Sequence, residues 1–120
     1  IEFWNAILED TQIDILMPQD CIGNCCSHLE EIPAQWQAWR KIADENKMKL
    51  WSHTELFERR SFYEPVNLYP ASPRRVAAQL ALTAPYAERH CCWEALHFAS
   101  ADAGGEGVIL QKYLQSGKIT

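Results

Sequence analysis

Three carboxylates stand at or near the ends of short apolar runs that are widely separated along the chain. They belong to Asp20, Glu55 and Glu94, and two of the runs also carry a histidine, His53 or His97. Two carboxyl groups that flank a sugar can hydrolyse a glycosidic bond, one as general acid and the other as base or nucleophile. This chemistry needs the carboxylates to converge, so it depends on the elements that carry them.

The apolar runs predict three β-strands with amphipathic helices between them, near residues 13–18, 50–55 and 90–97. Strands that alternate with helices at this spacing are typical of parallel β/α units, an α/β fold. In such a sheet the C-terminal ends of the strands lie at one edge. The sequence therefore predicts that Asp20, Glu55 and Glu94 gather there, as active-site residues do in a β/α barrel.

Three strands are too few to close a barrel, and an isolated three-stranded parallel sheet leaves both edges unpaired. The chain has 120 residues, 48% of them hydrophobic, which is enough for the core of one domain. It begins at Ile1, without a methionine and inside a helical pattern. We interpret residues 1–120 as a single domain, the C-terminal portion of a (β/α)8 TIM barrel. The missing half of the barrel or self-association should cover the sheet edges.

Helical periodicity and turn residues place the other elements. Helices are predicted over about 1–10, 33–46 and 72–84, and from 108 onward. Ser72 and Pro73 are a helix start with an N-cap residue and a first-turn proline, and Pro85 is a stop. Loops are expected over 19–32, 56–71 and 99–107. A long loop at the C-terminal end of a strand is more often functional than idle.

Alternation within the strands predicts which side chains face the barrel interior. In the second strand Trp51, His53 and Glu55 share one face, which suits the interior near its open mouth. In the third strand Trp93 suits packing against helices, which turns Glu94 inward in mid-strand. A buried carboxylate must be paired or reach a solvated cleft. Glu94 is then either a structural group that bonds His53 or the backbone, or a catalytic partner of Glu55.

Composition and charge argue against several classes of partner. The formal net charge is -5 and the basic pairs are scattered, so the sequence predicts no nucleic-acid partner. No apolar run approaches the roughly 20 residues of a membrane span. The five cysteines are an odd number and do not form a disulfide framework. Cys91 and Cys92 are interpreted as small buried hydrophobes on opposite faces of a strand.

A metal site is an alternative that the first loop raises. That loop holds four potential ligands: Cys21, Cys25, Cys26 and His28. Structural zinc sites usually combine two separated ligand pairs. The second pair could come only from distant residues: His90, Cys91 or His97. The favoured interpretation therefore has no metal and no cofactor.

Several segments resemble a bacterial family of glycoside-hydrolase-like TIM barrels that is known only as a domain of unknown function. The similarity is strongest in Met17-Pro18-Gln19-Asp20 and Glu55-Leu56-Phe57-Glu58. Further matches are Leu29-Glu30-Glu31-Ile32-Pro33, Leu50-Trp51, Tyr69-Pro70-Ala71 ahead of a helix with Gln79, and Ala84-Pro85-Tyr86. The resemblance implies that the three strands are the sixth, seventh and eighth of the barrel.

The chain also departs from the family pattern. The loop after Asp20 contains cysteines where the family has mainly glycine and small residues, and His53 stands where a polar amide is common. Of an aromatic-Asn-His run expected after Glu94, only His97 is present.

The resemblance implies roles for the candidate residues. Glu55, on the seventh strand, corresponds to the usual nucleophile position, with Glu94 as second acid or substrate-positioning group. Residues expected to line the sugar site are Asp20, Gln19, His53, His97, Trp51, Phe62 and Tyr63. The leading hypothesis is a glycoside hydrolase acting on carbohydrate. The alternative is a non-catalytic carbohydrate-binding or scaffold barrel.

Overall fold

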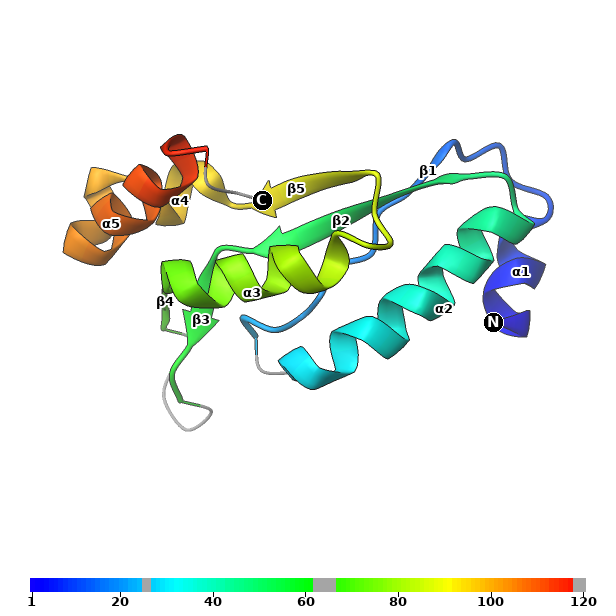
Figure 1. The fold of residues 1–120 in the computed structure, drawn as a ribbon, viewed down its shortest axis with the longest axis horizontal. Coiled ribbons are helices and arrows are strands. Elements are labelled where there is room, and N and C mark those ends of the chain that lie inside the picture. Colours follow the sequence, from blue (N-terminus) through cyan, green and yellow to red (C-terminus); the bar gives the residue numbers. More distant parts are fainter. Residues whose placement is uncertain (25–26, 62–66, 118–120) are drawn as a thin grey trace.

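A computed structural model describes residues 1–24, 27–61 and 67–117 of the chain. Its centre is a three-stranded sheet in the order β1-β2-β5, and both pairs of neighbouring strands are parallel (Figure 1). The strands are β1 (Ile15–Leu16), β2 (Lys49–Glu55) and β5 (Arg89–Trp93). The fold is therefore mixed α/β with parallel strands, consistent with consecutive β/α units.

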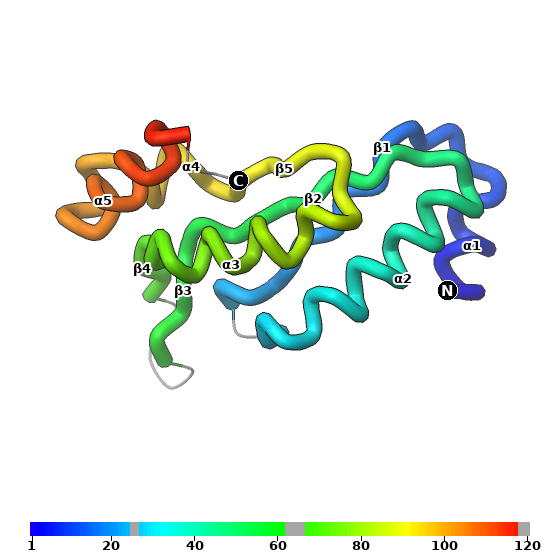
Figure 2. Tube along the Cα trace, viewed as in Figure 1, coloured from blue at the N-terminus to red at the C-terminus, as the bar shows by residue number. Residues whose placement is uncertain are grey.

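Two long helices lie on the same side of this sheet, as the ribbon and the tube both show (Figures 1 and 2). They are α2 (Ile32–Glu45), between β1 and β2, and α3 (Pro73–Thr83), between β2 and β5. The remaining helical elements are α1 (Glu2–Leu8), η1 (Leu29–Glu31), α4 (Ala95–Phe98), η2 (Ala101–Ala103) and α5 (Gly104–Gln115). Each central helix thus joins two neighbouring parallel strands, as a β/α unit requires.

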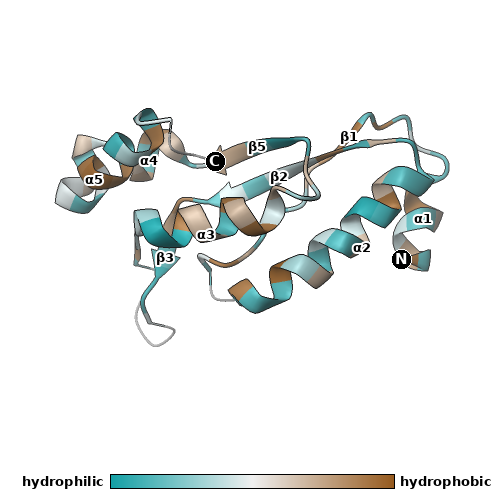
Figure 3. Ribbon diagram, viewed as in Figure 1, coloured by the Kyte–Doolittle hydropathy of each residue, from teal (hydrophilic) through white to brown (hydrophobic). Residues whose placement is uncertain are grey.

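Alternation along β2 explains how the sheet is covered. Leu50, Ser52 and Thr54 are fully buried, and Leu50 belongs to a core cluster with Trp36 of α2. The residues between them, Trp51 and His53, are only half-buried. Apolar and polar colours alternate around α2 and α3, as expected of helices with one covered side (Figure 3). No helix of the described ranges covers the Trp51 side, which we call the open face.

The signals predicted for α3 are confirmed. The Ser72 hydroxyl accepts a hydrogen bond from the backbone N–H of Arg75 at 3.3 Å, and Pro73 is the first helical residue. The helix ends at Thr83, two residues before Pro85. A second core cluster under this helix joins Val76 and Leu80 to Leu56, Phe57 and Leu110.

Two predicted strands are shorter in the structure. The first, predicted over 13–18, spans only Ile15–Leu16, although Gln19 forms an isolated parallel bridge with His53. The third, predicted over 90–97, ends at Trp93, and Ala95–Phe98 is helical. This change follows from packing, because the helical turn brings Phe98 into the core with only 6% of its surface exposed.

Two predicted loops contain regular structure. The segment 56–71 includes β3 (Phe57–Arg59) and β4 (Leu68–Pro70), which pair antiparallel. Phe57 is buried in the core, which fixes this hairpin on the molecule. In the segment 99–107, α5 already begins at Gly104. A Cβ on Gly107 would lie 2.3 Å from the carbonyl oxygen of Ser100, so only glycine permits this approach.

The described part of the chain is elongated rather than compact. Its radius of gyration is 15.4 Å and its extents are 45 × 35 × 26 Å, whereas a compact domain of this length has a radius of gyration of about 13.6 Å. None of the described helices is both long and apolar enough to cross a membrane.

Candidate functional site

The three candidate carboxylates lie at the same edge of the sheet. Glu55 is the last residue of β2, Asp20 follows the bridge between Gln19 and His53, and Glu94 follows β5 directly. The strands are parallel, so their C-terminal ends share this edge. The individual side chains nevertheless point into different surroundings.

Glu55 is buried and held by two hydrogen bonds. Only 2% of its surface is exposed. Its Oε1 accepts a hydrogen bond from Gln19 Nε2 at 2.5 Å, and its Oε2 accepts one from the backbone N–H of Asn24 at 3.0 Å. A Cβ on Gly23 would lie 2.1 Å from the carbonyl oxygen of Phe57 and 2.8 Å from Glu55 Oε2. Glycine is therefore required for the loop after β1 to cover this carboxylate.

Asp20 points away from the open face, toward the helices. Gln19 pairs with His53 on the open face, so the next residue along the chain faces the opposite side. Asp20 is 1% exposed, and its Oδ2 accepts a hydrogen bond from Gln79 Nε2 of α3 at 2.6 Å. In the structure this carboxylate therefore contacts a helix, and its role in substrate binding stays a prediction from the sequence.

The surroundings of Asp20 raise the pKa of its carboxyl group toward neutral pH. Burial raises its pKa from 3.8 to about 6, although hydrogen bonds from Gln79 and the Ile22 N–H act in the opposite direction. The nearby Glu55 charge raises this pKa further and the Arg75 charge lowers it. Burial also raises the pKa of the Cys92 thiol on the same side of the sheet, with smaller contributions from Cys91 and Asp20.

Neither Gln79 nor Arg75 is among the site residues predicted from the sequence, although Gln79 lies in a segment that resembles the family. Gln79 donates a hydrogen bond to Asp20, and Arg75 donates one to the carbonyl oxygen of Glu55. The two residues are also joined, because Arg75 Nη1 donates to Gln79 Oε1 at 2.8 Å. A signal for Gln79 is present in the sequence, because it follows Val76 by three residues and so lies in the apolar stripe of its helix. A polar residue in such a stripe needs a buried partner.

Glu94 has a different position from the one predicted. It is neither in mid-strand nor turned into a closed interior, since it precedes α4 and its side chain is 45% exposed. Its Oε2 lies 3.4 Å from His97 Nδ1, a residue predicted on the strand and found on α4. The peptide bond between Trp93 and Glu94 is cis. The structural alternative, in which Glu94 bonds His53 or the backbone inside the sheet, is thus not what the structure has: the side chain pairs with His97.

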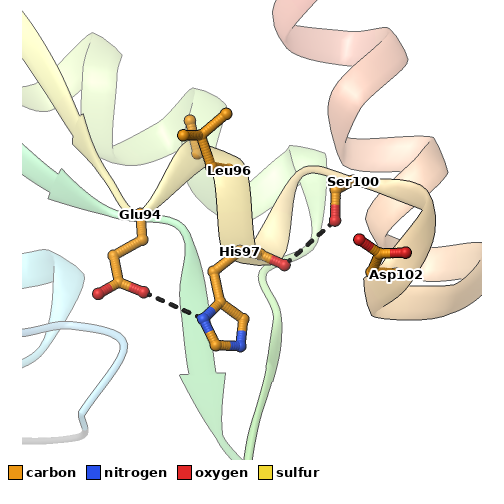
Figure 4. Close-up of a pocket in the computed structure, with 6 residues that line it drawn as sticks. Glu94, Leu96, His97, Ser100 and Asp102 are labelled. Carbon is orange, nitrogen blue, oxygen red and sulfur yellow. Dashed lines mark hydrogen bonds and ion pairs between the residues drawn. The ribbon is translucent and has the colours of Figure 1, made fainter.

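The Glu94–His97 pair borders an open hollow of about 610 Å³. Figure 4 shows the two side chains directed toward one another, while Leu96 points to the other side of the helical turn. Leu96 is 95% exposed. The remaining lining residues are Ala95, Ser100 and Asp102. Glu94 is therefore accessible to a solute, unlike Glu55.

Aromatic groups gather on the open face. The register pairs Trp51 with Arg89 and Glu55 with Trp93, so all four lie on the side of His53. The Arg89 guanidinium lies 5.7 Å from the centroid of a Trp51 ring, and the rings of His53 and Trp93 meet edge to face at 5.4 Å. The predicted packing of Trp93 against helices is therefore wrong, because Cys92 takes the helix-facing position in β5.

Some predicted residues lie outside the described ranges. These are Phe62 and Tyr63 of the sugar site, and Cys25 and Cys26 of the metal alternative. Within the described ranges, no group of three or more His, Cys, Asp or Glu side chains could hold a metal ion. His28, the histidine of that alternative, stands at the N-cap of η1.

Comparisons with known proteins give one structural match and one family match. A crystal structure from Bacteroides thetaiotaomicron VPI-5482, described as a "putative alpha-L-fucosidase", superimposes with a TM-score of 0.74 at 22% sequence identity. The match covers 99% of this chain and 35% of that one, so this chain spans about a third of that protein. No curated protein matches the sequence. The sequence profile of one family, described as "Domain of unknown function (DUF4434)", matches residues 1–103, and the chain therefore belongs to that family.

Proposed function

We propose that residues 1–120 form the last three β/α units of an eight-stranded β/α barrel. Three observations support this: the parallel order β1-β2-β5, helices on one face of the sheet only within the described ranges, and likeness to about a third of a larger protein. In a closed barrel the helices lie outside and the opposite face of the strands lines the interior. Trp51, His53 and Trp93 would then face the interior of the barrel.

We propose further that this barrel hydrolyses glycosides at the C-terminal edge of its strands. The observation that carries the proposal is the pair of carboxylates, Glu55 and Glu94, which end one of two neighbouring parallel strands and directly follow the other at that edge. Glu55 accepts two hydrogen bonds that fix its orientation, which suits a nucleophile or base. Glu94 is open to solvent beside His97, which suits an acid or a substrate-positioning group.

Carbohydrate is the proposed substrate because of the surroundings of these carboxylates. Flat aromatic rings can pack against the apolar side of a sugar, and Trp51 and Trp93 present such rings on the open face. Gln19, His53 and His97 supply polar groups close to the same edge. Phe62 and Tyr63 stay part of the proposed sugar site as sequence-based predictions.

The decisive variant is Glu55→Gln in the complete protein, assayed on a broad panel of aryl glycosides. Loss of a nucleophile should lower kcat at least about 1,000-fold, whereas glycan binding measured by calorimetry should persist because the amide keeps the shape of the side chain. Glu94→Gln should also lower kcat. Glu9→Gln, an isosteric change just after α1, is the control and should leave turnover unchanged. Full activity of Glu55→Gln would refute the assignment.

A second function, carbohydrate binding without hydrolysis, is favoured by one specific observation. Both oxygens of Glu55 are occupied, by Gln19 and by the Asn24 N–H, and the side chain is 2% exposed. A carboxylate held in this way can be structural. Glycan binding without turnover, unchanged in a Glu55→Gln/Glu94→Gln double variant, would establish this function in place of the first.

A further inference from the structure

A closed circuit of four hydrogen bonds and one peptide bond, that between Gln19 and Asp20, lies behind the C-terminal edge of the sheet. It runs through five residues, which we call the Arg75 ring: Arg75, Gln79, Asp20, Gln19 and Glu55. The ring joins α3 to the ends of β1 and β2. Three of its members follow or end strands and two belong to the helix, so it links elements that are distant in sequence.

The directions of the two hydrogen bonds that Gln79 makes in the ring are fixed by its neighbours. Arginine can only donate hydrogen bonds, and an ionised aspartate can only accept them. Gln79 stands between the two, so its Oε1 faces Arg75 at 2.8 Å and its Nε2 faces Asp20 at 2.6 Å. Gln79 is completely buried, which makes an unmatched amide costly. Glutamine is therefore the residue type that satisfies both neighbours at once.

Arg75 closes one side of the ring on the main chain of β2. Its Nη2 donates to the carbonyl oxygen of Glu55 at 3.1 Å and to that of Phe57 at 2.5 Å. The residue between these carbonyls, Leu56, is fully buried in the core cluster that also contains Val76 of α3. The guanidinium thus fixes the direction in which the chain leaves the strand, and with it the base of the Glu55 side chain.

On the other side of the ring, Asp20 is connected to Glu55 through the loop that contains Gln19 and Asn24. The backbone N–H of Asp20 donates to the carbonyl oxygen of His53 at 3.3 Å, which ties the loop to β2. The preceding residue, Gln19, donates to Glu55 Oε1, and Asn24, later in the same loop, donates to Oε2. A shift of the Asp20 carboxylate would therefore move the donors that orient Glu55.

We propose that Arg75 and Gln79 are positioning residues for the Glu55 carboxylate, acting through the β2 main chain on one side and the Asp20 loop on the other. Their assignment as positioning residues for catalysis rests on the hydrolase function proposed above. The positioning itself depends only on the contacts of the ring. α3 thus serves as the support of the site as well as a cover for the sheet.

Electrostatics agrees with this geometry. The charged and titratable groups that face Asp20 are Glu55 of β2, Arg75 of α3 and Cys92 of β5. Burial is the main cause that raises the pKa of Asp20 to about 6, and the Gln79 hydrogen bond is the largest opposing effect. Removing the Gln79 amide should therefore move the Asp20 titration upward, which provides a readout that does not depend on turnover.

The test uses the complete protein with 13C-labelled carboxyl groups followed by NMR across pH. Gln79→Leu should raise the Asp20 midpoint by about one pH unit or more and should also change the Glu55 carboxyl resonance. Arg75→Lys keeps the charge but cannot reach Gln79 and both carbonyls together, so it should change the Glu55 resonance too. In both variants kcat should fall about 10- to 100-fold with a smaller change in KM.

Matched controls and a second variant keep the test decisive. Arg74→Lys on the exposed side of α3 and Gln37→Leu on the exposed side of α2 should leave both carboxyl signals unchanged. If Gln79→Leu does not fold, the isosteric Gln79→Glu replaces it and should raise the Asp20 midpoint by charge repulsion. An unchanged Glu55 resonance in folded Gln79 and Arg75 variants would overturn the positioning role. Absence of hydrolysis in the wild-type protein with the NMR changes present would instead refute only the proposed function.

Discussion

At the scale of single residues, parity along a strand decides what each carboxylate can do. Gln19 and Asp20 are neighbours, yet one turns toward Glu55 on the open face and the other toward Gln79 under α3. Glu94, after β5, is exposed beside His97. The surroundings of the three acids therefore differ: Glu55 is buried and held by Gln19 and Asn24, Asp20 is buried against α3, and Glu94 is accessible. Of the three, only Glu94 is open to a solute in this structure, because Asp20 and Glu55 are 1% and 2% exposed.

The buried carboxyl group of Asp20 makes the free energy of unfolding depend on pH. The pKa of Asp20 is about 6 in the folded protein and 3.8 in a solvated carboxyl. The folded state therefore binds more protons between these values, and its stability falls as pH rises from about 4 to 6 and then levels. A shift of this size corresponds to about 3 kcal/mol. Asp20→Asn should lack this part of the profile, as urea unfolding at a series of pH values would show. If the unfolding free energies of wild type and Asp20→Asn changed equally with pH, this prediction would be contradicted.

At the scale of elements, the loop after β1 and the end of β2 fit together through a glycine. The Gly23 carbonyl accepts a hydrogen bond from the Arg59 N–H at 2.8 Å, and Asn24 donates to Glu55. The loop therefore contacts the β3 strand and the candidate carboxylate at once. This close approach leaves no room for a side chain at position 23.

Gly23→Ala should therefore separate the loop from Glu55. The added methyl group meets the Phe57 carbonyl, which is main chain and cannot turn aside, so unfolding free energy should fall by about 1–3 kcal/mol. Gly105→Ala is the matched control, since nothing lies within 4 Å of its Cβ and α5 would gain a better helix former. Thermal denaturation of both variants measures the difference. Equal melting temperatures would show that the loop adapts without cost.

At the scale of the whole molecule, the main feature is a sheet with one open face and two unpaired edges in the described part of the chain. The edge strands are β1 and β5. Trp93 is 44% exposed on the open face, and Ile15 of β1 is 36% exposed. Exposed aromatic surface and unpaired strand edges favour association with further protein. Further strands added to the edges or a second copy of the chain would satisfy both.

The 120-residue chain by itself should consequently self-associate. Sedimentation velocity should show a mass that rises with concentration, and Trp93→Ser should weaken the association because it removes apolar surface from the open face. Ile109→Ser on α5, where the side chain is 59% exposed away from the sheet, is the control. A wild-type chain that stays monomeric at every concentration would contradict this expectation.

Much of the chain follows from local signals. The helix from Pro73 to Thr83 is specified by Ser72, Pro73 and Pro85, because capping and proline chemistry act within a few residues. The alternation of Trp51 and His53 with Ser52 and Thr54 predicts the two faces of β2, since its period is a property of any strand. The resemblance to a family of unknown function is confirmed for residues 1–103.

Other features depend on contacts between distant segments. The end of β5 at Trp93 depends on the burial of Phe98, and the pairing of β3 with β4 depends on the burial of Phe57. The direction of Asp20 depends on Gln79, which is 59 residues away.

The sequence by itself determined the parallel α/β order and the edge at which the carboxylates end, because hydrophobic periodicity and helix signals are local. Only the tertiary structure decided which carboxylate is buried, which is exposed and which side chains hold Glu55. Those outcomes depend on how helix and strand pack, and a buried polar group takes its direction from whatever partner the packing brings within hydrogen-bonding distance.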